Sequence, residues 1–302
     1  MKRPLSGIFP PITTPFDADG EIQVDRFKAN LERWSEFGLA GLTVLGSNGE
    51  SPFLSDDEKL LLVREARPLI GQNKIMIVGA GREATRASVQ FIRKIADLGA
   101  DYALVGTPCY FKSSMTDEAL FAHFWSIADS SPIPVLIYNV PQFTGVNTSA
   151  GLIERLSRHE SIAGIKESSG NLVLQADIRR RTPERFQLLV GSAATLLPSL
   201  IQGASGGVVA IACALPGPTV DLHRAFDAGD WKRAAELQRL LIPLATAVTT
   251  QYGIAGLKAA MDLTGFYGGE PRAPLLPLGQ SERAALKSIF QAAGLLEVAQ
   301  RV

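Results

Sequence analysis

The chain has 302 residues, of which 46% are hydrophobic and 20% charged, so it carries enough apolar material for a folded core. Lysine plus arginine and aspartate plus glutamate both number 30, and this balance argues against a nucleic-acid-binding protein and against a disordered acidic tail. No stretch approaches 18 consecutive apolar residues, and prolines interrupt the start, MKRPLSGIFPPITTPF, where a secretion signal needs an apolar core. We therefore expect a cytoplasmic protein without a membrane span.

One pattern recurs along the chain: a short apolar run ends at Gly, Ser, Thr or Pro, and an amphipathic helical segment follows. Runs that are apolar on both faces are typical of parallel strands covered by helices. Eight evenly spaced units favour a closed (β/α)8 TIM barrel over a doubly wound sheet, which usually has fewer strands. The runs are 8–15, 41–46, 74–81, 101–108, 133–141, 162–170, 186–193 and 206–212.

The segments between the runs carry helix-start signals. Ser55-Asp56-Asp57-Glu58 reads as a capping box, and Thr148 is placed to cap a later helix. After Pro216 the pattern is helical only. We therefore predict a catalytic barrel domain over 1–224 and a C-terminal α-helical extension over 225–302 that packs on the barrel.

The two cysteines, Cys109 and Cys213, each lie beside apolar residues and are expected as reduced core residues. Neither they nor the three histidines have the spacing of a metal site. The phosphate-binding loop, the dinucleotide fingerprint and the hydrolase nucleophile motif are also missing from the sequence. We expect no metal and no organic cofactor.

One lysine stands out among the strand ends, where a (β/α)8 barrel carries its active site. Lys166 is the only lysine or arginine that ends one of the eight runs. A lysine in a desolvated pocket can attack a carbonyl as a free amine and form a Schiff base. The alternatives are a solvated strand-end lysine and an ion-pair partner of Glu167.

Two other strand ends offer polar groups. Gly46-Ser47-Asn48-Gly49 follows the second run, and its backbone N–H groups and the Ser47 hydroxyl can bind a substrate carboxylate. A plain glycine turn before a helix is the alternative. Tyr110 and Tyr138 follow the fourth and fifth runs, where a phenol beside a hydroxyl can relay protons. A core tyrosine with a hydrogen-bonded tip is the alternative for each.

The motifs GSNGE, TPCY, YNVP and GIKES, in this order, resemble the dihydrodipicolinate synthase / N-acetylneuraminate lyase family over nearly the whole chain. Members of that family are class I, Schiff-base aldolases on (β/α)8 barrels that use or release pyruvate. The resemblance implies Lys166 as the Schiff-base lysine and Tyr138 as the acid–base phenol. It also implies that Ser47 and Asn48 bind the pyruvate carboxylate.

The same resemblance extends to the pocket wall and to assembly. It implies that Gly191 and Val208 line the pocket. Tyr110 matches the tyrosine that family dimers insert into a neighbouring subunit's site, which implies a homo-oligomer, expected as a dimer of dimers. The expected ligand is a small 2-oxo acid that contains the pyruvate moiety, with no nucleic-acid or membrane partner.

The chain departs from the dihydrodipicolinate synthase pattern in three features. Phe143 stands where those synthases usually carry an arginine for the carboxylate of aspartate semialdehyde, and a benzyl group cannot replace a guanidinium. Ser47-Asn48 replaces a Thr-Thr pair. Glu83 and Cys109 replace the Asn and Tyr through which feedback-inhibited members bind lysine.

Further motifs, including GSNGE, TPCY and GFYGG, look most like those of 4-hydroxy-2-oxoglutarate aldolase. We therefore predict cleavage of 4-hydroxy-2-oxoglutarate to pyruvate and glyoxylate. The first alternative is 4-hydroxy-tetrahydrodipicolinate (dihydrodipicolinate) synthase, which condenses pyruvate with aspartate semialdehyde, and the second is a keto-sugar-acid lyase or dehydratase. A non-catalytic binder on the same barrel leaves Lys166, Tyr138 and Ser47 together without a role, and a phosphate-binding enzyme leaves Lys166 unexplained.

Overall fold

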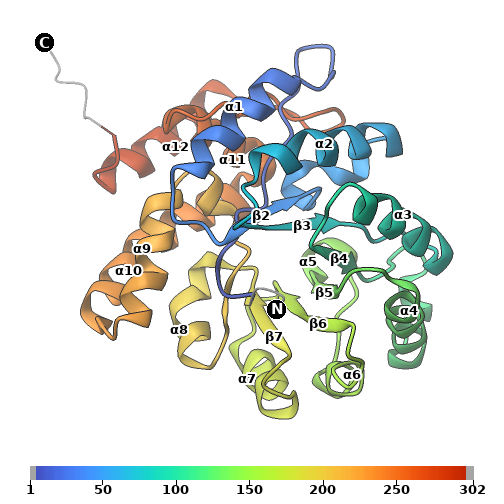
Figure 1. The fold of residues 1–302 in the computed structure, drawn as a ribbon. Helices are drawn as coiled ribbons and strands as arrows, with labels where there is room; N and C mark the ends of the chain where they lie inside the picture. The colour runs from blue at the N-terminus through green and yellow to red at the C-terminus, as the bar shows by residue number, and fades with distance from the viewer. Residues whose placement is uncertain (1–4, 297–302) are drawn as a thin grey trace, which may run out of the picture.

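The structure is a computed structural model that describes residues 5–296. Eight parallel strands form a nearly closed barrel with helices around it, which confirms the predicted (β/α)8 TIM barrel (Figure 1). Each strand overlaps one of the predicted apolar runs. The strands are β1 (Gly7–Ile8), β2 (Gly41–Val44), β3 (Ile75–Gly79), β4 (Tyr102–Gly106), β5 (Val135–Asn139), β6 (Ile162–Glu167), β7 (Gln187–Val190) and β8 (Gly206–Gly207).

The strands follow one another around the barrel in the order β1, β8, β7, β6, β5, β4, β3, β2. Between β1 and β2 the ladder is reduced to a parallel bridge from Pro11 to Thr43 and to single hydrogen bonds. The N–H of Ala40 donates to the Ile8 carbonyl at 3.1 Å, and the N–H of Ile12 donates to the Thr43 carbonyl at 2.9 Å. Pro10, whose carbonyl accepts from the N–H of Thr43 at 2.9 Å, faces β2 but has no N–H to continue a regular ladder, so the barrel closes only loosely at this seam.

Helices alternate with the strands around the barrel. Those between or beside the strands are α1 (Val24–Ser35), α2 (Asp56–Leu69), α3 (Thr85–Asp97), α4 (Asp117–Ser130), α5 (Pro141–Thr144), α6 (Ala150–Leu156), α7 (Leu172–Arg181) and α8 (Leu196–Ile201). The chain then continues through α9 (Pro216–Asp227), α10 (Trp231–Thr246), a π-helical turn (Ala247–Gln251), α11 (Gly253–Leu263) and α12 (Gln280–Ala292). Short 3-10 turns cover Ser47–Gly49, Ser51–Phe53, Lys112–Ser114, Ala193–Thr195 and Ala210–Cys213.

The predicted helix starts are confirmed at α2 and shifted by one residue at α6. The Ser55 hydroxyl accepts from the N–H of Glu58, and the Glu58 carboxylate accepts from the N–H of Ser55, so the capping box is complete. At α6 the prediction of Thr148 as the cap is wrong. Ser149 caps this helix by accepting from the N–H of Leu152, while the N–H of the buried Thr148 donates to another side chain.

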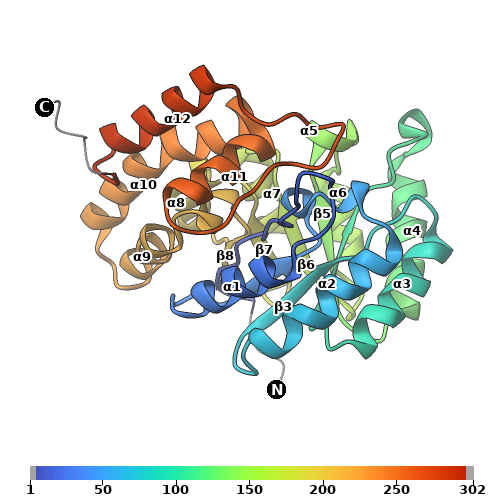
Figure 2. The same cartoon turned by 90° about the horizontal axis from the view of Figure 1, so that it is seen from above.

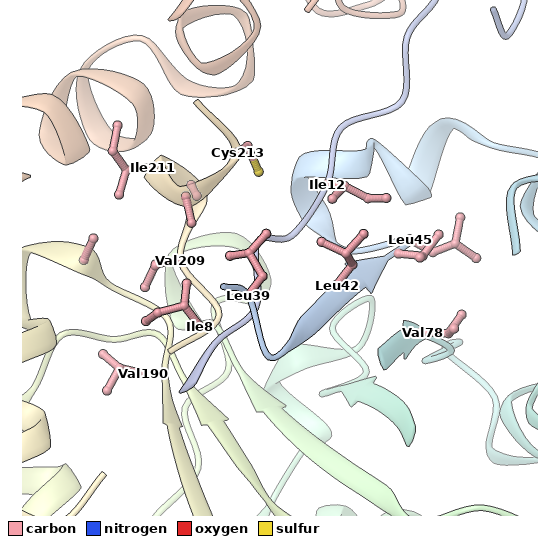
Figure 3. Close-up of a cluster of buried hydrophobic side chains, with 14 of the residues drawn as sticks. Ile8, Ile12, Leu39, Leu42, Leu45, Val78, Val190, Val209, Ile211 and Cys213 are labelled. Atoms are coloured by element: carbon pink, nitrogen blue, oxygen red, sulfur yellow. The ribbon is translucent and has the colours of Figure 1, made fainter. Parts of the chain in front are cut away.

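The core has two layers because successive strand side chains point to opposite faces. Ile75 and Ile77 of β3 belong to an inner cluster that fills the barrel, whereas Met76 and Val78 belong to a larger cluster between strands and helices. Figure 3 shows part of the outer cluster, including Leu42 and Val78. The inner cluster closes the barrel, so a ligand has access only at its ends.

The two cysteines differ in their surroundings. Cys213 is fully buried in the outer cluster, as predicted for a core residue. Cys109 is only partly buried on the loop after β4, where its thiol lies 3.4 Å from the Glu83 carboxylate. The prediction of a core position is therefore wrong for Cys109, because β4 ends at Gly106 and Cys109 lies on the loop beyond it.

The segment after β8 is helical, as predicted, and α10, α11 and α12 lie together at one side of the barrel (Figure 2). The Gln238 side chain of α10 joins this part to the barrel: it accepts from the N–H of Leu197 at 2.7 Å and donates to the Ala193 carbonyl at 2.9 Å. The predicted division into 1–224 and 225–302 stays a prediction; its boundary falls inside α9, and its last six residues lie outside the described ones.

None of the helices between residues 5 and 296 has the length and apolar character needed to cross a membrane. The cytoplasmic location stays a prediction.

Candidate active site

A cavity of about 300 Å³ opens at the C-terminal ends of the strands, the end at which barrel enzymes carry their sites. Seven of the eight predicted site residues line this one cavity, although they come from six different strand ends or loops. They are Ser47, Asn48, Tyr138, Phe143, Lys166, Gly191 and Val208. The structure thus brings together residues that are up to 161 positions apart in the sequence (Ser47 and Val208), as the strand-end rule implies.

Lys166 lies at the end of β6 and is only 4% exposed. Its Nζ is 4.1 Å from the centroid of the Tyr138 ring, and the two residues are register partners on β6 and β5. Glu167 points to the opposite face and binds Asn139 and Gln175. The two alternative interpretations of Lys166, a solvated strand-end lysine and an ion-pair partner of Glu167, therefore do not describe this arrangement.

A hydrogen bond joins the Tyr138 hydroxyl to the Ser47 hydroxyl at 3.2 Å. Ser47 begins the 3-10 turn Ser47–Gly49, which is bracketed by two non-glycine residues with left-handed backbones, Leu45 (φ 59°) and Glu50 (φ 55°). Such conformations are unfavourable outside glycine and persist where surrounding contacts enforce them. The polar turn is therefore held in one shape against the cavity.

Glu50 shows which contacts hold this turn. Its Oε1 lies 2.6 Å from Lys258 Nζ of α11, and both side chains are fully buried. The other carboxylate oxygen accepts from the N–H of Arg272 at 2.8 Å, and Lys258 Nζ also donates to the Glu270 carbonyl at 2.8 Å. Burial lowers the pKa of Lys258, and the attraction of Glu50 offsets part of that effect.

Gly191 allows β7 to approach β6 closely. A Cβ at this position would lie 1.7 Å from the Ser168 hydroxyl oxygen, so a side chain here would displace Ser168. Ser168 also lines the cavity, and its buried hydroxyl has no hydrogen-bond partner among residues 5–296. Ser168 is not among the site residues predicted from the sequence, and its place two residues after Lys166 is the only local signal that points to it.

The C-terminal helices supply a further wall that was not predicted. Val248, Thr249 and Thr250 of the π-helical turn and Gly253 and Ile254 of α11 border the cavity. Helix periodicity in the sequence does not distinguish a π-turn from an α-helix. Only the tertiary packing shows that this segment reaches the site.

Two aromatic residues lie farther out. Phe143, on α5, is 66% exposed at the rim of the cavity. Tyr110 is the one predicted site residue that does not line it: the residue is 79% exposed, and its ring packs edge-on against Phe111, with centroids 4.9 Å apart. The predicted insertion of Tyr110 into a neighbouring subunit stays a prediction.

No three or more His, Cys, Asp and Glu side chains within residues 5–296 are grouped so that they could hold a metal ion. The reactive groups that the cavity does present are an amine, a phenol and hydroxyls.

Comparison with known proteins agrees with this geometry. The model of the dihydrodipicolinate synthetase family matches residues 4–293. The 4-hydroxy-tetrahydrodipicolinate synthase of Exiguobacterium sp. is 35% identical over 288 residues, which cover 95% of this chain and 97% of that protein. The proteins of this name support the predicted alternative, the synthase, better than they support 4-hydroxy-2-oxoglutarate aldolase.

Solved structures extend the similarity to the whole fold. The dihydrodipicolinate synthase of Thermotoga maritima has a TM-score of 0.92 at 28% identity and covers 97% of this chain and 100% of its own. YagE, a prophage protein of E. coli K12 solved in complex with pyruvate, has a TM-score of 0.90 at 27% identity and covers 96% of this chain and 99% of its own. The chain belongs to the dihydrodipicolinate synthetase family, whose members are carbon–carbon lyases of the class I aldolase type.

Proposed function

We propose that this protein is a pyruvate-dependent class I lyase in which Lys166 forms the Schiff base. The observation that carries the proposal is the position of Lys166 Nζ, buried in the cavity beside the Tyr138 ring at 4.1 Å from its centroid. An amine held away from water and next to a phenol is suited to attack a ketone and to exchange protons during that attack.

The chemistry assigned to these residues is as follows. The neutral Lys166 amine attacks the C2 ketone of the 2-oxo acid, and loss of water leaves an imine. In the cleavage direction Tyr138 takes the proton of the C4 hydroxyl while the C3–C4 bond breaks, and C4 departs as the aldehyde carbon of glyoxylate. The electron pair of the broken C3–C4 bond moves into the protonated imine to form an enamine. The enamine is then protonated at C3, and water releases pyruvate and restores the lysine. Condensation runs through the same steps in reverse.

The carboxylate of the 2-oxo acid is assigned to the turn at Ser47 and Asn48. Both residues line the cavity, and the Ser47 hydroxyl already binds the Tyr138 hydroxyl at 3.2 Å. One hydroxyl that contacts both the carboxylate and the phenol would orient the substrate and hold the acid–base group in line with it.

The second substrate has two candidates. The names of the relatives support condensation of pyruvate with aspartate semialdehyde. The second candidate is cleavage of 4-hydroxy-2-oxoglutarate. Phe143 at the cavity rim counts against the synthase reaction, because its benzyl group offers no charge for the carboxylate of the semialdehyde. We rank the synthase reaction first because the relatives carry that name. We expect the side chain at position 143 to determine its kcat/KM.

Trapping with borohydride tests the proposal. Pyruvate with borohydride is expected to add a reduced adduct to the tryptic peptide that contains Lys166, and the Lys166→Arg variant is expected to remain unlabelled. Absence of the adduct on the wild-type protein would refute the Schiff-base mechanism. Condensation with aspartate semialdehyde and pyruvate release from 4-hydroxy-2-oxoglutarate are then measured side by side, and the larger kcat/KM identifies the second substrate.

We also propose that the protein assembles as a dimer of dimers. Tyr110 and Phe111 together form an exposed aromatic pair beside the barrel mouth, and large exposed aromatic groups are typical of interfaces. Light scattering on the purified protein is expected to give the mass of four chains, and a monomeric mass would contradict this proposal.

A further inference from the structure

A buried polar cluster lies directly behind the site residues of β5 and β6. Tyr138 pairs with Lys166 in the register of these strands, and the next residues, Asn139 and Glu167, form the following pair. Because strand side chains alternate, Tyr138 and Lys166 face the cavity while Asn139 and Glu167 face the helix layer. Asn139 and Glu167 are therefore direct neighbours of the two site residues on the same strands, but their side chains do not face the cavity.

The Glu167 carboxylate is fully buried and receives three hydrogen bonds. Oε1 accepts from Asn139 Nδ2 at 3.1 Å and from the N–H of Ser169 at 2.8 Å, and Oε2 accepts from Gln175 Nε2 at 2.9 Å. All three donors are neutral amides. A buried carboxylate is costly unless hydrogen bonds satisfy it, so the Glu167 carboxylate holds each of its three donors in place.

The cluster continues beyond the carboxylate to the surrounding elements. Asn139 Oδ1 accepts from the N–H of Thr148 at 3.1 Å, and Asn139 Nδ2 also donates to the side-chain oxygen of Asn147 at 2.8 Å. Gln175 Oε1 accepts from the hydroxyl of Ser199, on α8, at 2.6 Å. Hydrogen bonds thus join β5, β6, the loop before α6, α7 and α8.

We infer that Glu167 is a positioning residue, which fixes the relative placement of Lys166 and Tyr138 by tying their two strands to each other and to α7. The inference rests on the proposed Schiff-base function. Glu167 directly follows the attacking Lys166 in the chain, and Asn139 directly follows Tyr138. A displacement of reacting groups by about 1 Å can lower a rate by about 100-fold, so loss of this anchor acts on the reaction without contact to the substrate.

The test compares two substitutions at the same position. Glu167→Met keeps the approximate size but removes all three acceptor contacts. Glu167→Gln keeps an oxygen for Asn139 and Ser169, and its new amide can donate to Gln175 once that side chain turns its own oxygen toward it. The readout is the rate at which pyruvate and cyanoborohydride label Lys166, measured over a range of pyruvate concentrations.

Glu167→Met is expected to lower the maximal labelling rate about 100-fold, while the half-saturating pyruvate concentration changes by less than about threefold because the Ser47 turn is untouched. Glu167→Gln is expected to restore the rate to within about tenfold of wild type. If Glu167→Met does not fold, Gln175→Met removes one donor from α7 instead and is expected to lower the maximal rate about tenfold.

Ile165→Ala is the matched control. Ile165 is fully buried on the same outward face of β6, two residues before Glu167, so its truncation lowers the stability of the fold without touching the polar cluster. Its labelling rate is expected to stay within about threefold of wild type. A rate loss in Ile165→Ala equal to that in Glu167→Met, or an unchanged rate in Glu167→Met, would overturn the inference. A wild-type protein that is not labelled at all would instead refute the proposed function.

Discussion

Replacing Lys258 with methionine removes the cation of a fully buried ion pair and leaves Glu50 charged in the interior. The two charged atoms are 2.6 Å apart, and both side chains are 0% exposed. At an effective dielectric constant of about 20, Coulomb's law gives a gross attraction on the order of 6 kcal/mol at this distance. Desolvation of both ions offsets much of that attraction in the intact protein.

The variant loses the attraction but keeps the cost of burying Glu50. Among residues 5–296 only the N–H of Arg272 still donates to that carboxylate, and methionine preserves the apolar packing of the lysine stem. We therefore expect Lys258→Met to lower the free energy of unfolding by about 3–5 kcal/mol. Glu50→Gln in the same chain removes the stranded charge and keeps the acceptor for Arg272, so the double variant should recover about 1–3 kcal/mol.

Urea unfolding followed by tryptophan fluorescence, at one protein concentration for all four proteins of the cycle, measures these differences. Lys28→Met is the matched control, because Lys28 forms its ion pair with Glu65 at the surface, where its side chain is 41% exposed. That control should lose less than about 1 kcal/mol. A loss below about 1 kcal/mol in Lys258→Met, or strict additivity in the double variant, would refute the reasoning.

Three further predictions follow from the site and from one buried histidine. Tyr138→Phe should lower kcat about 10²- to 10⁴-fold while pyruvate still labels Lys166, because only the acid–base group is lost; unchanged kcat would exclude that role. Phe143→Arg should raise kcat/KM for aspartate semialdehyde by about tenfold or more, because a guanidinium can pair with its carboxylate, and an unchanged value would mean that position 143 does not meet this substrate. Burial lowers the pKa of His123 to about 4 from 6.5, so between these pH values the unfolded chain binds a proton that the folded chain does not. The contribution of the neutral, buried His123 to the free energy of unfolding is therefore complete above pH 6.5. It is lost as the pH falls toward 4, and the loss amounts to about 3 kcal/mol in total. Urea unfolding at several pH values should therefore show a shallower decline for His123→Gln than for wild type, and equal declines would contradict the assignment.

The sequence alone was sufficient to predict the architecture, because the signals that define strands and most helix starts are local. Apolar runs such as 74–81 need only their own residues to be recognised as strands buried on both faces. The Ser55 capping box likewise depends on groups three residues apart. At Thr148 and Ser149 the local signal was ambiguous, since either hydroxyl can cap a helix, and the tertiary contact of Thr148 with Asn139 decided between them.

The sequence also indicated most of the candidate site, because barrel topology converts strand ends into neighbours. Lys166, Tyr138 and Ser47 could be grouped on that rule before any distance was known, and the cavity contains all three. Cys109 shows the limit of the same rule, since an apolar neighbourhood in the sequence does not tell where a loop leaves the core.

The tertiary structure decided what surrounds the reactive groups. Glu50 and Lys258 lie far apart in the chain, and nothing in either local sequence shows that they meet without water at 2.6 Å. The π-helical turn Ala247–Gln251 reaches the cavity only through the packing of the C-terminal helices. The cluster around Glu167 depends on donors from a strand, a loop and a helix. Local periodicity therefore determined which strand carries the lysine, whereas contacts between distant segments decided how that lysine is held.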